Sequence, residues 1–176
     1  MGEIKPPSLV KLIVGMISAK EDLFKKVKEK MEQKFGPVDF QSPLLPFTYT
    51  RYYEDEMGKN LKRKFLSFFS LIDPKEIVEV KLFTNELEQS FLYPNSKRRR
   101  INIDPGYLSS SKLVLVTTKN YAHRIYLKKG IYAEVTLRYE GKSFKPWEWT
   151  YPDYKSEAYL QIFQEIRKIY RQQIRR

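Results

Sequence analysis

Apolar residues recur at helical spacing in three stretches of the chain, each long enough for a helix of several turns. Asp73 and Glu76 stand at the spacing of a capping box before the second stretch, and Ser18 and Glu21 stand so before the first. The pattern therefore predicts helices at residues 19–35, 74–91 and 156–173. The side chains expected in the core are Phe24, Val27, Phe35, Ile77, Val80, Ile162, Phe163 and Ile166.

Segments rich in β-branched and aromatic residues indicate strands between these helices. We expect extended structure at residues 10–17, 38–41, 49–53, 61–69 and 101–104. The last of these should end at Asp104-Pro105-Gly106, a sequence typical of a tight turn. Residues 113–118 are β-branched but follow Ser109, which could cap a helix, so both strand and helix stay open there.

A β-hairpin is predicted where two segments, residues 123–127 and 131–139, flank a turn that contains Gly130. Alternation along the first strand places Arg124 on the face opposite His123. The register of a short turn brings together the side chains of one face, which are Arg124, Tyr126, Tyr132 and Glu134.

The order of the predicted elements favours one α+β domain over residues 1–176. Its sheet should be mixed or antiparallel, and three main helices should pack on it. We expect a ferredoxin-like core, followed by the hairpin and the C-terminal helix.

Composition excludes several classes of protein. The 176 residues include no cysteine, which rules out disulfides, thiol catalysis and cysteine-rich zinc sites. No apolar run approaches the roughly 20 residues of a membrane span, so we expect a cytoplasmic protein without a membrane partner. With a single histidine, no metal site is predicted, and the sequence identifies no cofactor. The lack of cysteine and the many Lys, Glu, Ile and Tyr residues resemble thermophile composition.

The positive charge is concentrated in one part of the chain. The formal net charge is +12, and residues 91–130 hold nine basic side chains and one acid, Asp104. A basic stretch of this kind could bind phosphates, or it could form a solvated loop. The predicted ligand-binding residues are Lys97, Arg98, Arg99, Arg100, Lys119, Arg124 and Tyr132.

Several long segments of the sequence resemble those of a known family. Among them are residues 52–58, 102–108, 130–136 and 149–154. Together they resemble an uncharacterised prokaryotic family known as domain of unknown function 4416, over essentially the whole chain. Members of that family are sometimes labelled GTP-binding, but this chain has no Gly-x-x-x-x-Gly-Lys-Ser/Thr motif.

Three hypotheses about function follow from these observations. The first is a module that binds a phosphate-bearing ligand (a nucleotide, RNA or another polyanion) through the basic residues 91–130. The second is a small enzyme acting on a phosphorylated substrate, with His123, Glu134 and Asp104 as candidate catalytic residues beside Lys119 and Arg124. The third is a structural or protein-interaction domain. The sequence does not determine the oligomeric state.

Overall fold

The computed structural model describes residues 2–175, which form nine strands and four α-helices. The strands are β1 (Val10–Ser18), β2 (Val38–Gln41), β3 (Leu45–Pro46), β4 (Lys62–Ile72), β5 (Ile101–Leu108), β6 (Lys112–Thr117), β7 (Ile125–Lys128), β8 (Ile131–Glu140) and β9 (Ser143–Pro146). The α-helices are α1 (Glu21–Phe35), α2 (Glu54–Met57), α3 (Ile77–Ser90) and α4 (Glu157–Gln173). Two short 3-10 helices are η1 (Pro74–Glu76) and η2 (Asp153–Lys155).

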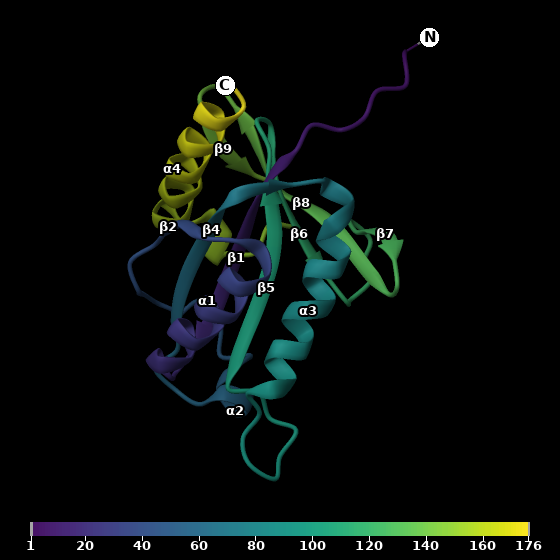
Figure 1. Ribbon diagram of the computed structural model, residues 1–176. Helices are drawn as coiled ribbons and strands as arrows, with labels where there is room; N and C mark the ends of the chain where they lie inside the picture. The colour runs from purple at the N-terminus through teal and green to yellow at the C-terminus, as the bar shows by residue number, and fades with distance from the viewer. Residues whose placement is uncertain (1, 176) are drawn as a thin grey trace.

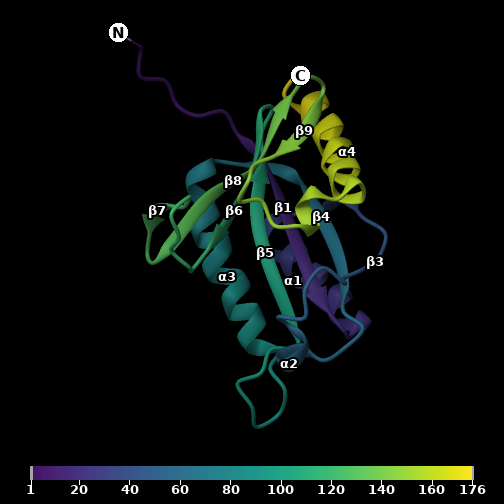
Figure 2. The same ribbon diagram turned by 180° about the vertical axis from the view of Figure 1, so that it is seen from behind.

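All strands belong to one antiparallel sheet, in the order β2-β4-β1-β5-β6-β8-β7 (Figure 1), with β3 beside β4 and β9 beside β8 (Figure 2). With the short β3 and α2 set aside, the segment from β1 to β5 has the order β-α-β-β-α-β, and its strands lie in the sheet as β2-β4-β1-β5. This is the arrangement of a ferredoxin-like core, to which β6–β9 and α4 are added. The predicted α+β class is confirmed.

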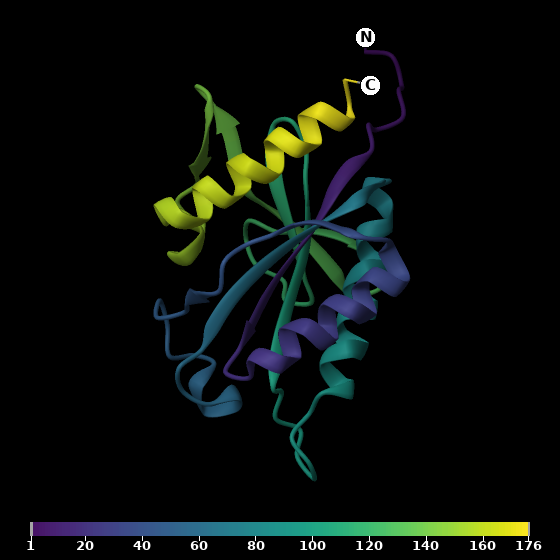
Figure 3. The same ribbon diagram turned by 60° about the vertical axis from the view of Figure 1, so that its left-hand side comes forward.

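Helices cover both faces of the sheet. Figure 3 shows α1 (purple) and α3 (teal) on one face of the sheet and α4 (yellow) on the other. Figure 2 shows the molecule from behind, relative to Figure 1, with α4 labelled. Strand β1 is buried along its whole length, as expected for a central strand. Its Val14 packs into the core beneath α1 and α3, and Ile13 packs into the core beneath α4. The alternation of β1 therefore supplies both hydrophobic cores.

The three predicted main helices are confirmed, but one of their predicted caps is wrong. Asp73 and Glu76 form the expected capping box before α3. Helix α1 instead begins at Glu21 without a side-chain cap, because Ser18 still belongs to β1 and its hydroxyl oxygen accepts from the Lys20 N–H (2.9 Å), before the helix begins. The same hydroxyl donates to the Arg100 carbonyl oxygen (2.7 Å). None of the helices in residues 2–175 is long and apolar enough to cross a membrane.

Seven of the eight predicted core residues are buried, and Phe35 is the exception. Phe35 lies in the last turn of α1 and is half-buried, with its ring edge-on to Phe68 and Phe83. The helix ends there, so the following turn of the chain cannot cover the ring.

Two of the predicted extended segments differ in the structure. Residues 49–53 form a bend and a turn leading into α2, with the Glu54 N–H donating to the Arg51 carbonyl oxygen (2.9 Å). Strand β5 does not end at the predicted turn but continues through Gly106 to Leu108. A Cβ at Gly106 would lie 2.3 Å from the Val114 carbonyl oxygen, so the glycine permits close approach of β6. The segment left open at 113–118 is strand β6.

Truncation of Phe163 and of Phe35 compares the loss of a buried ring with the loss of a half-buried one. Phe163→Ala should lower the free energy of unfolding by about 3–5 kcal/mol, because the Phe163 ring is fully enclosed under α4. Phe35→Ala should cost about 1–2 kcal/mol. Urea denaturation of both variants checks this, and equal costs would contradict the assigned helix faces.

Candidate functional site

Strands β5 and β6 separate from one another partway along the sheet. They pair only where Gly106–Leu108 of β5 meets Leu113–Leu115 of β6. Toward the start of β5 and the end of β6, the two strands diverge (Figure 1). The edge of β5 is there bonded to side chains of α3 instead. The Ile103 N–H donates to Glu88 Oε1 (2.5 Å), and Lys81 Nζ donates to the Ile103 carbonyl oxygen (3.1 Å). A buried backbone needs such partners, so α3 makes the opening of the sheet possible.

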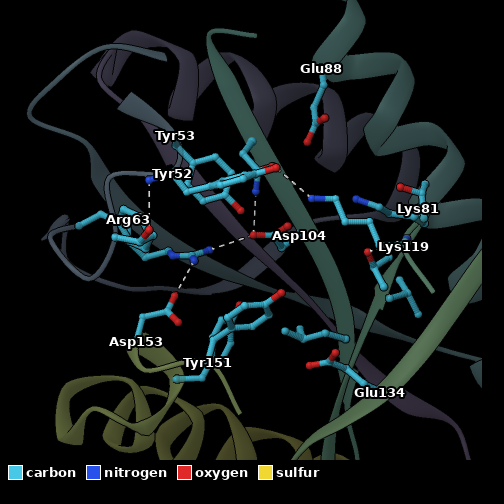
Figure 4. A pocket seen from close by; sticks show the side chains of 18 of the residues that line it. Tyr52, Tyr53, Arg63, Lys81, Glu88, Asp104, Lys119, Glu134, Tyr151 and Asp153 are labelled. Carbon is cyan, nitrogen blue, oxygen red and sulfur yellow. Dashed lines mark hydrogen bonds and ion pairs between the residues drawn. The ribbon is translucent and has the colours of Figure 1, made fainter. Parts of the chain in front are cut away.

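A pocket of about 820 Å³ occupies this opening (Figure 4). Its walls come from β5, β6 and α3, together with residues 47–53 and 151–154. Ionisable side chains of both signs line it. The basic ones are Arg63, Lys81, Arg99, Lys119 and Arg124, and the carboxylates are Glu88, Asp104, Glu134 and Asp153.

Arg63 is the charged group at the base of the pocket. It is fully buried on β4, and its guanidinium pairs with Asp104 (3.2 Å) and Asp153 (2.9 Å). Burial by itself lowers the pKa of Arg63, but the surrounding acidic groups raise it overall, so the side chain stays charged. Aromatic rings surround the guanidinium, with the Phe47 ring centre 5.2 Å away. One cation thus holds two carboxylates in place.

The Asp104 carboxylate is fixed through only one of its oxygens. Its Oδ2 accepts hydrogen bonds from Arg63 Nη1 and from Asn102 Nδ2 (2.8 Å). No donor within residues 2–175 is bonded to Oδ1. The side chain is 30% exposed and lines the pocket (Figure 4). Asp104 therefore presents an oriented, free carboxylate oxygen to anything that the pocket binds.

Of the basic run at residues 97–100, only Arg99 lines the pocket. Its guanidinium makes two bonds to Glu56 (2.6 and 2.7 Å) and one to Glu88 (3.1 Å). These carboxylates neutralise the charge predicted to hold phosphate. Lys97 and Arg98 are exposed outside the pocket, and Arg98 and Arg100 lie over the ring of Tyr93.

The hairpin brings Glu134 beside Arg124, as its predicted register requires, and both residues line the pocket. Glu134 is buried, and its Oε2 accepts from Arg124 Nε (2.8 Å) and lies 3.1 Å from His123 Nε2. The prediction that His123 and Arg124 occupy opposite faces is wrong. Strand β7 begins only at Ile125, so strand alternation does not apply to the two residues before it.

The predicted site residues are only partly brought together. Asp104, Lys119, Arg124 and Glu134 line one pocket. His123 lies behind Glu134 with its ring stacked on Trp149 (5.5 Å between ring centres), and it does not line the pocket. Tyr132 packs against Tyr126 on the hairpin, also outside the pocket.

Sequence reasoning missed the contributions of Arg63, Lys81, Glu88 and Asp153 to this site. Lys81 and Glu88 did carry a signal, because two charged residues seven positions apart lie on the buried side of a helix. Such residues are rarely buried without a specific partner. Arg63 and Asp153 are 90 residues apart, and no local pattern connects them.

Burial disfavours the ionisation of two acids in the pocket, Glu88 and Asp153. Desolvation raises the pKa of Glu88 and also that of Asp153, although nearby cations oppose the shift. Burial and the charge of Asp104 likewise raise the pKa of Tyr53, so its hydroxyl remains a hydrogen-bond donor. The pocket therefore holds acidic groups that are harder to ionise than in water.

Two cations of the pocket have no carboxylate within ion-pair distance in residues 2–175, namely Lys81 and Lys119. The ammonium of Lys81 is bonded to a backbone carbonyl, and that of Lys119 donates to the Tyr52 hydroxyl (3.1 Å). Figure 4 shows both lysines on the side of the pocket away from Arg63 and Asp153. This side could therefore receive an anionic group.

Fold and site define an α+β protein with a charged pocket where its sheet opens. Residues 8–170 match the family model described as Domain of unknown function (DUF4416), and the chain belongs to this family. No curated protein and no solved structure matches the chain.

The raised pKa of Glu88 predicts a pH dependence of stability. The native state keeps a proton on Glu88 that the unfolded chain releases near its ordinary pKa of 4.5. The stabilising contribution of Glu88 is therefore complete below that pH and is lost as the pH rises through the higher native pKa. As the pH rises above 4.5, the wild type should lose stability relative to Glu88→Gln. Urea denaturation at a series of pH values checks the expectation, with the exposed Glu148→Gln as the control that should follow the wild type.

Proposed function

We propose that this protein binds a small phosphate-bearing ligand in the pocket between β5 and β6. The observation that supports this best is the pair Lys81 and Lys119, whose ammonium groups face the pocket without a carboxylate partner. Lys81 is buried, and a buried cation attracts an anion more strongly than an exposed one does, because water screens it less. Lys119 adds a second, exposed ammonium at the same pocket. A phosphate between the two lysines would complete the charge balance.

The size of the pocket favours a ligand of nucleotide or sugar-phosphate dimensions over a polymer. Small-molecule sites typically measure about 300–1,000 Å³, and this one measures about 820 Å³. The arginines that a polyanion would need are occupied, since Arg99 is bonded to Glu56 and Arg124 to Glu134. These bonds leave less positive charge for a long polyanion than the sequence suggests.

Two tyrosines at the pocket provide contacts for the part of the ligand that carries no phosphate. Tyr52 and Tyr151 are 65% and 53% exposed and come from different loops. Their hydroxyls are bonded to Lys119 (3.1 Å) and Arg124 (3.3 Å). The rings thus offer apolar surface beside the cations, which suits a ligand with a planar or apolar portion.

Lys119→Met and Lys81→Met test the proposal. A thermal-shift screen with inorganic phosphate, sugar phosphates and nucleoside mono-, di- and triphosphates should find a ligand that raises the melting temperature of the wild type. Each lysine variant should weaken that ligand's binding by about 10- to 100-fold, as expected for loss of a charged hydrogen bond. Lys119 is exposed, so its variant should fold normally. Lys168→Met on the surface of α4 is the matched control and should bind like the wild type.

RNA or another polyanion stays the second candidate, because Lys97, Arg98 and Arg100 lie outside the pocket, and Arg98 and Arg100 stand over the ring of Tyr93. The salt dependence of RNA binding tests this second candidate. Replacing these three residues with serine should flatten the salt slope more than replacing Arg167, Lys168 and Arg171, since fewer phosphates would be contacted. Arg99 is left intact because its ion pairs hold the pocket together. Equal slopes for the two triple variants, or no RNA binding at low salt, would exclude this candidate.

A further inference from the structure

Asp104 has a geometry that ligand binding alone does not explain. Arg63 and Asn102 fix one carboxylate oxygen, and the other faces the pocket without a donor from residues 2–175. The side chain stands on β5, a rigid central strand bonded to β1 along its length. A carboxylate held in this way keeps its orientation while one oxygen is free to accept a proton.

The free oxygen cannot serve as a phosphate contact. Two anions at hydrogen-bond distance repel one another, and the cations suited to phosphate, Lys81 and Lys119, line the same pocket. In Figure 4 these lysines stand to one side of Asp104, and Arg63 and Asp153 stand to the other. A ligand whose phosphate lies at the lysines would therefore place a proton-bearing group, such as water, next to Asp104.

We propose that Asp104 is the general base of a hydrolase that cleaves a phosphate ester in this pocket. The inference rests on the proposed binding of a phosphate-bearing ligand. Asp104 Oδ1 takes a proton from water as the water oxygen forms a bond to phosphorus. The bond from phosphorus to the ester oxygen breaks, and the leaving oxygen keeps the electron pair and takes a proton from solvent. Asp104 then releases its proton to solvent, which restores the carboxylate.

The cations that surround the site support this step. Lys81 and Lys119 can neutralise charge that gathers on the phosphoryl oxygens, as cationic groups do in phosphoryl transfer. Arg63 keeps Asp104 oriented through its bond to Oδ2. Because Arg63 also pairs with Asp153, it is held on two sides and cannot turn toward the ligand.

Phosphate release is measured with p-nitrophenyl phosphate, glucose 6-phosphate and ATP as probes, in buffer containing EDTA. The wild type should release phosphate from at least one of them. Asp104→Asn should slow this release by about 100-fold or more, the usual contribution of a general base. It should still bind inorganic phosphate, as judged by the rise in melting temperature. Asp104→Glu should restore part of the rate, and the exposed Asp22→Asn on α1 should match the wild type.

The outcomes separate this inference from the proposed function. If phosphate raises the melting temperature but the wild type hydrolyses none of the three probes, the base assignment fails and ligand binding stands. Asp104→Asn with full activity, or with lost phosphate binding, also overturns the assignment. Phosphate release that requires Mg²⁺ would also overturn the assignment, because Asp104 would then be a ligand of the metal and not the base. If neither phosphate nor any probe shifts the melting temperature, the proposed function itself fails.

Discussion

The structure of the site depends on how the backbone of Ile103 is satisfied. In an ordinary sheet, its N–H and carbonyl groups would bond to β6, and the two strands would stay together. Here Glu88 and Lys81 of α3 take the place of that strand. A buried edge without such partners would cost several kcal/mol, about 1–3 for each group. The two charged side chains of one helix therefore allow the sheet to open, and the opening is the pocket.

The pocket contains more charge than stability alone would favour. Burying ions is costly, and a buried pair is often no better than packed apolar groups of the same size. Arg63 is fully buried and pairs with Asp104 and Asp153, and Arg99 joins Glu56 to Glu88. A network of this kind holds its members in fixed positions. Retaining it at such cost is typical of a site whose geometry matters for binding or chemistry.

Charge counted along the chain only partly indicates which cations line the pocket. Residues 97–100 form the densest basic run, yet only Arg99 reaches the pocket, and carboxylates from α2 and α3 pair with it. Lys81, which has no such partner, comes from a segment without excess charge. Whether a cation is available to a ligand depends on its neighbours in space, and these come from distant parts of the sequence.

The sequence by itself determined the elements whose signals are local. Helical periodicity and the capping box before α3 depend on residues three or four positions apart, and the hairpin depends on Gly130 and alternation. The tertiary structure decided what depends on distant contacts. Gly106 continues a strand because Val114 approaches it closely, and His123 meets Glu134 because β7 begins one residue after Arg124. The pairing of Arg63 with Asp153 spans 90 residues, and only the packing of strands and loops brings such groups together.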